Sequence, residues 1–403
     1  MTDSLNPVRR SPLVALGGGI LALLVVMGIG RFAYTLLLPL MQQEFGFGPR
    51  AAGWLASANY LGYFVGSLAA TAWPLRRATR PALLAAFVAS TLTSLGMGLT
   101  HSLVLWLALR FVSGVASAWV FVFVSALVLT ELREARLDRL TGWIYGGVGV
   151  GIALTATLAL VLPVRDAAQL WILFGVISGL LLAAAAPLLP TRQSISPPNT
   201  GESRRAAEQA QRGRGLLLFA YCLEGVGYVV SATFIVAIVD AAQGGFESGA
   251  WVWIIVGLAG IPACVLWTRH ADYRRALNRL ATAYWIQAAG IVAVAVAPNS
   301  VDAALASAAT LGATLVGVVM LTIGLAPAID PEHPRRIVGQ LTIGFSLGQM
   351  MGPVLAGYAA DYFGSFHVSL LSSALLVALS ALATHAMNVR PDPKVSTQEA
   401  SGT

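Results

Sequence analysis

The chain has 403 residues, of which 57% are apolar and only 11% are charged. Soluble domains carry about 25% charged residues, so this composition excludes a water-soluble globule and indicates a polytopic membrane protein. The excess of 25 Lys and Arg over 18 Asp and Glu does not indicate a nucleic-acid partner. These cations lie mostly in short segments between apolar runs, where they determine the orientation of a membrane protein.

Apolar runs long enough to cross ~30 Å of hydrocarbon occur twelve times along the chain. We expect helices at about 13–40, 51–75, 81–100, 103–130, 140–163, 167–190, 215–240, 249–268, 277–297, 302–328, 335–361 and 366–388. The first run is too long for the apolar segment of a cleaved secretory signal, so we expect it to remain as the first helix. The lipid bilayer is therefore an expected partner.

Basic residues are concentrated on one side of the predicted membrane. Alternate loops and the two chain ends place 21 of the 25 cations on one side and only Arg50 and Arg165 on the other. Because cytoplasmic segments carry the excess of Lys and Arg, both termini are expected in the cytoplasm. The last two cations, Arg31 and Arg110, fall within predicted helices.

The longest polar stretch divides the chain into two similar parts. Residues 191–214 are rich in Ser, Pro, Gln and Arg and predict a cytoplasmic linker between six-helix units at 1–190 and 215–390, followed by a tail at 391–403. An offset of 197 places seven of the twenty glycines of the first part on glycines of the second, including Gly28 on Gly225 and Gly151 on Gly348. The expected fold is all-α, with two pseudo-symmetric six-helix bundles.

Three charged residues lie inside apolar runs, where a charge costs several kcal/mol and is a functional candidate by default. They are Arg31, Arg110 and Glu224. Burial favours a neutral carboxyl and a nearby cation favours a charged one, so Glu224 is a candidate for proton coupling, with Arg110 in support. Two simpler roles stay open: Glu224 could only tie two helices together through an arginine, and Arg110 could extend its side chain to the outer surface.

Helical spacing extends the candidate site. Arg31 shares a helix face with Tyr34, and Glu224 shares one with Tyr228, on helices that the offset of 197 relates. The candidates for substrate contact are Arg31, Tyr34, Asn59, Tyr63, Tyr228 and Gln340. Tyrosines and amides in membrane helices also serve as interhelical contacts, and this alternative remains for each of them.

Enzyme chemistry lacks the residues it needs. The five histidines lie at helix ends or in loops without metal-ligand spacing, and the only lysine, Lys394, excludes a Walker A motif. The two cysteines, Cys222 and Cys264, form no CxxC pair. We therefore expect no catalytic residue, no metal and no cofactor.

These features together resemble the major facilitator superfamily (MFS). Arg110-Phe-Val-Ser-Gly114 is similar to the RxxxG motif of its fourth helix, whose arginine is implicated in proton coupling, although Ser113 replaces the commoner glutamine. Residues 147–151 and 352–364 also resemble superfamily patterns. The motif expected after the second helix departs from the family, because Gly66-Ser-Leu-Ala69 is followed by Ala70 and lacks the aspartate that latches the cytoplasmic gate.

A narrower resemblance lies near the N-terminus. Gly28-Ile-Gly-Arg-Phe-Ala-Tyr34 and Ala52-Gly-Trp-Leu-Ala-Ser-Ala-Asn59-Tyr-Leu-Gly-Tyr63 are similar to the YbfB/YjiJ branch of bacterial MFS transporters. The resemblance implies a monomeric secondary transporter in the bacterial inner membrane that works by alternating access.

The function expected from this reasoning is proton-coupled movement of a small organic solute, as symport or antiport. Two intramembrane cations against one acid favour an organic anion or zwitterion. The alternatives are efflux of hydrophobic drugs and a membrane sensor that binds a solute without transporting it.

Overall fold

The computed structural model describes residues 11–72, 75–190, 204–243, 245–267, 273–330 and 334–389, and these residues form helices and no strand. The first half contains α1 (Pro12–Leu23), the π-helix η1 (Leu24–Ile29), α2 (Ala33–Phe45), α3 (Pro49–Ala72), α4 (Leu75–Leu99), α5 (Leu103–Glu134), the short 3-10 helix η2 (Asp138–Leu140), α6 (Thr141–Val161) and α7 (Ala167–Ala185). The second half contains α8 (Arg204–Gln243), α9 (Phe246–Trp267), α10 (Tyr273–Val296), α11 (Val301–Leu315), α12 (Gly317–Gly324), α13 (Ala326–Ile329), α14 (Pro334–Phe363) and α15 (His367–Val389).

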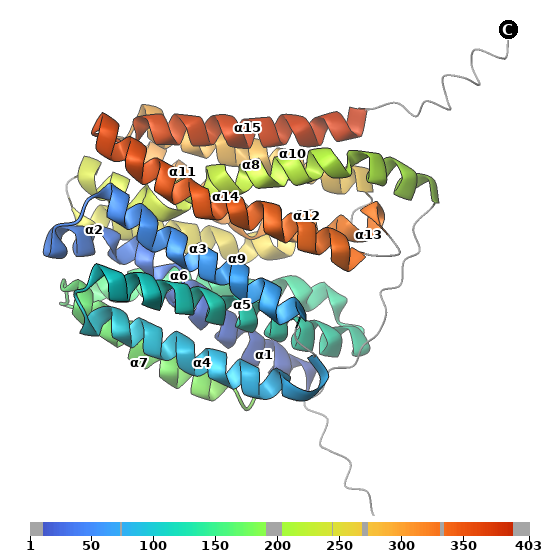
Figure 1. Cartoon of the computed structure of the whole chain (residues 1–403), viewed down its shortest axis with the longest axis horizontal. Coiled ribbons are helices and arrows are strands. Elements are labelled where there is room, and N and C mark those ends of the chain that lie inside the picture. The colour runs from blue at the N-terminus through green and yellow to red at the C-terminus, as the bar shows by residue number, and fades with distance from the viewer. Residues whose placement is uncertain are drawn as a thin grey trace, which may run out of the picture.

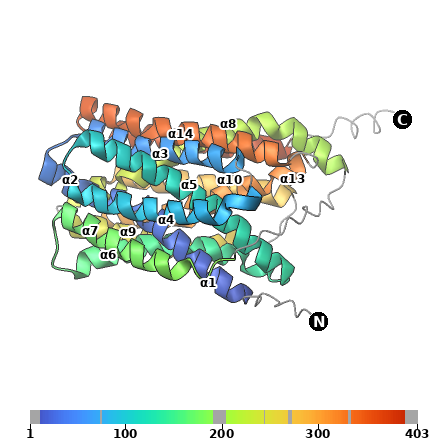
Figure 2. The same cartoon turned by 60° about the horizontal axis from the view of Figure 1, so that its bottom comes forward.

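The long helices run roughly side by side and reverse direction at short turns (Figure 1). We call the end of the bundle where α1 and α8 begin and α15 ends the terminal face, and the opposite end the distal face. Figure 2 shows the same division from a second angle. The expected tail and residues 191–203 of the expected linker lie outside the described residues, and α8 already begins at Arg204, before the end of that expected linker.

Local sequence explains the tight turns at the distal face. Gly46 follows α2 with a φ of 69° and Gly364 follows α14 with a φ of 67°, a left-handed conformation in which glycine ends a helix without steric cost. The side chain of Asp166 accepts a hydrogen bond from the backbone N–H of Gln169 and so caps the start of α7. Ser300 caps α11 in the same way through Ala303.

The two halves pack against each other along two matched helix pairs. α3 contacts α14 and α6 contacts α9. Within each half the same glycine contact recurs: Gly28 packs on Gly151, and Gly225 packs on Gly348, both displaced by the predicted 197 residues. A Cβ added at Gly28 would lie 2.5 Å from the Cα of Gly151, and one at Gly348 would lie 2.8 Å from the carbonyl carbon of Gly225. The pseudo-symmetry expected from sequence is therefore confirmed.

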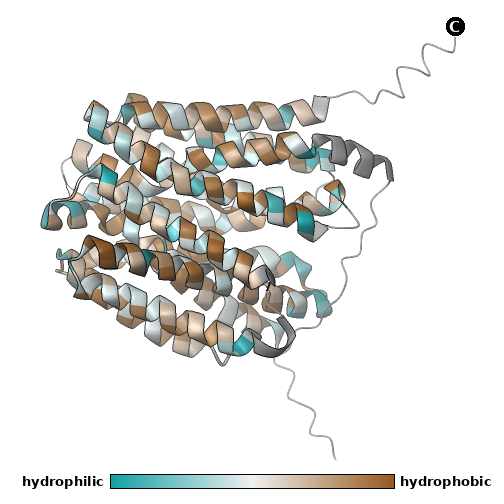
Figure 3. Ribbon diagram, in the orientation of Figure 1, coloured by the Kyte–Doolittle hydropathy of each residue, from teal (hydrophilic) through white to brown (hydrophobic). Residues whose placement is uncertain are grey.

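The outer surface of the bundle is suited to lipid. Ten helices or helix series among the described residues are long and apolar enough to cross a membrane. Large apolar side chains such as Leu92, Leu180 and Leu375 are exposed on the surface, and hydrophobic colouring dominates the helices in Figure 3. α3 and α14, of 24 and 30 residues, are not among these ten, although each coincides with an expected apolar run.

Each of the twelve expected apolar runs coincides with one helix or with consecutive helices. Two runs are not single helices as expected: 13–40 is divided into α1, η1 and α2, and 302–328 is divided into α11, α12 and α13. The first break is held by side chains from α5, a contact that run length alone does not reveal.

Candidate functional site

The site begins with the break in the first membrane helix. In η1 the backbone hydrogen bonds join residues five apart, such as the N–H of Gly30 to the carbonyl of Val25 at 2.8 Å and the N–H of Phe32 to the carbonyl of Met27 at 3.1 Å. A π-helical segment leaves carbonyls without their usual helical partners. The turn at residues 30–32 therefore needs donors from elsewhere.

One face of α5 supplies those donors. Arg110 Nη1 donates to the carbonyl of Gly30 at 3.1 Å, and Nη2 donates to the carbonyl of Arg31 at 3.3 Å. Ser113 Oγ also donates to Gly30, and Ser117 Oγ donates to the carbonyl of Val26 at 3.0 Å. Arg110 is buried and does not extend to the outer surface. Its guanidinium holds the broken helix in place, and the Tyr34 ring lies 4.7 Å from it.

Close approach of α3 and α5 fixes the position of this donor face. A Cβ at Gly62 would lie 1.9 Å from the carbonyl oxygen of Phe111, and one at Gly114 would lie 2.0 Å from the carbonyl oxygen of Asn59. Asn59 Nδ2 donates to the carbonyl of Arg110 at 3.0 Å. Asn59 is therefore an interhelical contact in this structure.

Arg31 projects from the turn at the break and has aromatic neighbours on α3. Its guanidinium carbon lies 4.6 Å from the ring centroid of Tyr60 and 4.5 Å from that of Tyr63. The side chain is buried, and its Nε has no hydrogen-bond partner among the described residues. Aromatic faces stabilise a cation without using its N–H donors. Arg31 Nε is thus an unused donor inside the bundle.

Glu224 lies on α8, in the second half. Its Oε1 accepts a hydrogen bond from Gln287 Nε2 at 2.8 Å, across from α10. The side chain is 2% exposed, and neither Glu224 Oε2 nor Gln287 Oε1 has a partner within the described part of the chain. The buried carboxyl is therefore held by a neutral amide.

A stack of aromatic rings lies beside the Glu224 carboxyl. Phe345 of α14 stacks on Tyr221 with centroids 4.2 Å apart and on Tyr228 with centroids 5.4 Å apart. Gln349 donates to the hydroxyl of Tyr228. Tyr228 is within electrostatic reach of both Arg31 and Glu224. We refer to the central cluster as the residues Arg31, Tyr60, Tyr63, Tyr228, Phe345, Glu224 and Gln287.

The structure brings together four of the eight predicted site residues. Arg31, Tyr63, Tyr228 and Glu224 belong to the central cluster. The other four are held by contacts outside the cluster, apart from the bond of Arg110 to the backbone carbonyl of Arg31. Arg110 and Asn59 hold helices, the Tyr34 hydroxyl donates to the carbonyl of Ala52 at 2.9 Å, and Gln340 accepts a hydrogen bond from Arg214.

Sequence reasoning missed Tyr60, Phe345 and Gln287. Gln287 carried a usable signal, because it is a polar residue in the apolar run 277–297, as Glu224 is in its own run. Tyr60 and Phe345 carried none, since aromatic residues are common in membrane helices and only the packing shows which rings face Arg31 or Tyr228. Among the described residues, no group of three or more His, Cys, Asp or Glu side chains is placed to hold a metal ion.

Two related bundles of membrane-crossing helices around a buried polar centre define a multi-pass carrier for small molecules. A model of the family described as uncharacterised MFS-type transporter YbfB matches residues 23–385. The chain belongs to this family, so it is a transporter of the major facilitator superfamily and a multi-pass membrane protein. The resemblance expected from the N-terminal motifs is confirmed.

Solved structures support the same fold. The nucleoside transporter NupG superposes with a TM-score of 0.69 at 14% identity, covering 94% of this chain and 100% of its own. A point mutant of NupG superposes equally well at 13% identity, covering 93% of this chain and 99% of its own. The human organic anion transporter MFSD10 (TETRAN) has a TM-score of 0.60 at 14% identity, covering 94% of this chain and 100% of its own. A search of curated protein sequences found no significant match.

Proposed function

We propose that this transporter moves a small organic anion or zwitterion across the bacterial inner membrane by alternating access, coupled to protons, with both termini in the cytoplasm. The observation that supports it is a buried cation and a buried acid, one from each half, that both keep unused hydrogen-bonding atoms. Buried charges in membrane proteins mark substrate and proton pathways. Arg31 binds the acidic group of the solute, and Glu224 exchanges the proton.

The Glu224–Gln287 pair suits proton exchange because one amide can serve both forms of the carboxyl. Gln287 Nε2 donates to Glu224 Oε1, an oxygen that can accept in either form of the carboxyl. In the charged form, Glu224 Oε2 has no partner among the described residues. In the protonated form, Oε2 becomes a donor, and Gln287 Oε1 is a buried acceptor that also lacks a partner there. Protonation therefore allows two hydrogen bonds between the groups where the charged form has one.

Proton release from purified protein in weak buffer tests this proposal, with a panel of organic acids, amino acids and cationic drugs. We expect an organic acid or amino acid to evoke a pH change in the wild type and none in Glu224→Gln. The matched control is Asp302→Asn, which removes an exposed acid from the first turn of α11 and should leave the signal unchanged. A signal of full size in Glu224→Gln would remove this residue from the coupling mechanism.

Efflux of apolar drugs is the second candidate function. It is favoured by the stacked rings of Tyr221, Phe345 and Tyr228. Stacked rings present a flat apolar surface that binds other rings without hydrogen bonds. In that case Phe345→Ala abolishes export of aromatic drugs, while Glu224→Gln and Arg31→Gln retain drug binding. Drug accumulation in cells that express each variant distinguishes the two functions.

A further inference from the structure

Three side-chain contacts join the two halves at the distal face. Arg50 at the start of α3 pairs with Asp361 near the end of α14, Nε to Oδ2, at 3.3 Å. Gln43 of α2 donates to Asp240 Oδ2 of α8 at 3.3 Å. Arg165, which follows α6, pairs with Glu247 at the start of α9, Nη2 to Oε1, at 3.7 Å. These six residues are called the distal clasp.

The clasp follows the internal symmetry of the molecule. Gln43 and Asp240 are separated by 197 residues, as are Thr35 and Ala232, whose contact lies deeper between α2 and α8. Residues that the repeat makes equivalent can touch only where the pseudo-twofold axis passes between them. Arg50 and Glu247 are also separated by 197 residues. The two ion pairs therefore flank the axis, and the amide–carboxylate pair lies on it.

The clasp is polarised, because every donor comes from the first half and every acid from the second. Arg50, Gln43 and Arg165 face Asp361, Asp240 and Glu247. Arg50 and Arg165 are also the two cations that the sequence places on the distal side. Cations are disfavoured on the non-cytoplasmic side of bacterial membrane proteins, so their presence there needs a specific use. Both are used to bind the other half.

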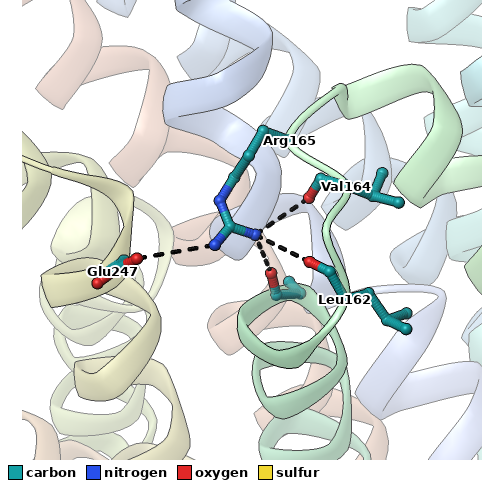
Figure 4. Close-up of polar contacts among 5 residues, drawn as sticks. Leu162, Val164, Arg165 and Glu247 are labelled. Carbon is teal, nitrogen blue, oxygen red and sulfur yellow. Dashed lines mark hydrogen bonds and ion pairs between the residues drawn. The ribbon is translucent and has the colours of Figure 1, made fainter.

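Each arginine is anchored by further contacts. Arg165 Nη1 donates to the carbonyls of Ala159, Leu162 and Val164 at 2.8, 3.1 and 3.2 Å, at the end of α6 (Figure 4). The cation there faces the negative end of the helix dipole. Arg50 lies 4.4 Å from the ring centroid of Tyr358, which belongs to the other half. Arg165 is thus oriented by its own half, whereas the Tyr358 contact adds to the attachment of Arg50 to the other half.

The two ion pairs, Arg50–Asp361 and Arg165–Glu247, are the contacts of the clasp that separate most easily. The side chains of Arg50 and Asp361 are 55% and 26% exposed, and those of Arg165 and Glu247 are 45% and 75% exposed. Exposed ion pairs are weak and are screened by salt. A contact of this strength can break and re-form during a transport cycle, whereas a dry, tightly packed interface cannot do so as readily.

We propose that the distal clasp is a charge-polarised gate that sets the fraction of molecules open at the distal face. Opening this face separates all three contacts, and each ion pair favours the closed form by about two- to fivefold. Opposite charges within each pair close the gate, so exchanging the two charges within each pair preserves closure. This inference does not depend on the cargo or on proton coupling.

Labelling of a single cysteine beneath the clasp tests the gate. Ser57 is buried and donates to the carbonyl of Met350 in the other half at 2.7 Å, two turns below Arg50 on α3. The reporter is Ser57→Cys in a Cys222→Ser/Cys264→Ser background, treated in intact cells with a membrane-impermeant maleimide. Exposed Ser102→Cys at the distal face and Arg139→Cys near the terminal face report separately which face the reagent reaches.

We expect Arg50→Gln/Arg165→Gln to speed labelling of the reporter by about four- to twenty-five-fold, because the effects of the two pairs multiply. Adding salt should speed labelling of the reporter alone but not of this neutralised variant. The fourfold swap Arg50→Asp/Asp361→Arg/Arg165→Glu/Glu247→Arg should return labelling to the slow rate. Arg274→Gln/Arg336→Gln, which removes two cations near the terminal face, is the matched control and should change nothing.

Two results would overturn the proposal. One is a labelling rate in the neutralised variant within twofold of the reporter alone. The other is a swapped variant that labels as fast as the neutralised one, since opposite charges within each pair would then not close the gate. Size-exclusion profiles of each purified variant show whether it is folded, and the swap keeps the test decisive because it retains every charge.

Discussion

The two buried arginines of the first half differ in what their guanidinium groups contact. Arg110 donates through Nη1 and Nη2 to two backbone carbonyls of the broken helix, whereas the Arg31 guanidinium lies against aromatic rings of α3. The Nε of each arginine is buried without a partner among the described residues. The difference is therefore that Arg110 satisfies backbone carbonyls, which would otherwise be left without donors. The same residue type therefore has two different roles within one half of the molecule.

This contrast predicts effects of different size from two identical substitutions. Arg110→Gln leaves the carbonyls of Gly30 and Arg31 without their donors and should lower the free energy of unfolding by about 2–4 kcal/mol. Arg31→Gln removes contacts with Tyr60 and Tyr63 but leaves no backbone carbonyl without a donor, so it should cost less stability while abolishing binding of an acidic ligand. Melting curves of both variants in detergent measure the difference. Equal losses of stability would contradict the assignment.

The sequence was sufficient to find the charged residues of the site but not their partners. Arg31, Arg110 and Glu224 are recognisable because each interrupts an apolar run. Tyr34 was grouped with Arg31 by spacing on a continuous helix, yet the turn at residues 30–32 interrupts that helix, and the Tyr34 hydroxyl bonds to Ala52. Partners on other helices depend on axial rotation and depth, which a single run of residues does not encode.

At the scale of elements, α3 and α5 approach each other backbone to backbone. Gly62 and Gly114 face the backbone of the opposite helix, where a methyl group would lie within about 2 Å of a carbonyl oxygen. This contact sets the depth of Arg110 against the broken first helix, because Arg110 and Gly114 lie one turn apart on α5. The position of the central cluster therefore depends on glycines that do not belong to it.

Adding one methyl group at this contact should separate the two helices. We expect Gly62→Ala to destabilise the protein by about 1–3 kcal/mol through overpacking against Phe111. Gly339→Ala is the control, because a Cβ there has no neighbour within 4 Å, and it should be neutral or stabilise α14 by up to about 1 kcal/mol. Thermal melting of the two variants provides the comparison, and a tolerant Gly62 would argue against a rigid α3–α5 contact.

Helix existence followed from run length and composition, and the repeat followed from the glycine offset, because both signals are local or additive along the chain. The breaks did not. The π-helical segment at Leu24–Ile29 contains ordinary helix-compatible residues, and it persists because α5 supplies donors to its carbonyls. A break stabilised by another helix has no signature within its own sequence.

At the scale of the molecule, the distal clasp and the central cluster occupy different levels along the same interface between halves. Contacts at the distal face hold α3 to α14 and α2 to α8, while the central cluster lies deeper, toward the terminal face. The clasp contacts therefore lie between the central cluster and the distal face. Binding and passage across the membrane can thus be separated experimentally.

Locking the distal face should stop transport but not binding. In Gln43→Cys/Asp240→Cys, in the Cys222→Ser/Cys264→Ser background, a short bifunctional thiol reagent joins α2 to α8 on the pseudo-twofold axis. We expect cross-linked protein to bind solute in detergent with near wild-type affinity and to show no flux in proteoliposomes. Each single-cysteine variant, treated alike, is the control. Flux that survives complete cross-linking would show that the distal face need not open.

The contact on the pseudo-twofold axis requires the two halves of the molecule to differ in sequence. In a chain with identical halves, positions 43 and 240 would carry the same side chain and face each other across the axis. Two carboxylates at the observed 3.3 Å would repel, and two glutamines would give a neutral contact. The amide–carboxylate pair exists only in a molecule whose halves already differ. A chain with identical halves therefore could not have this polarised clasp, which depends on the difference between the side chains at positions 43 and 240.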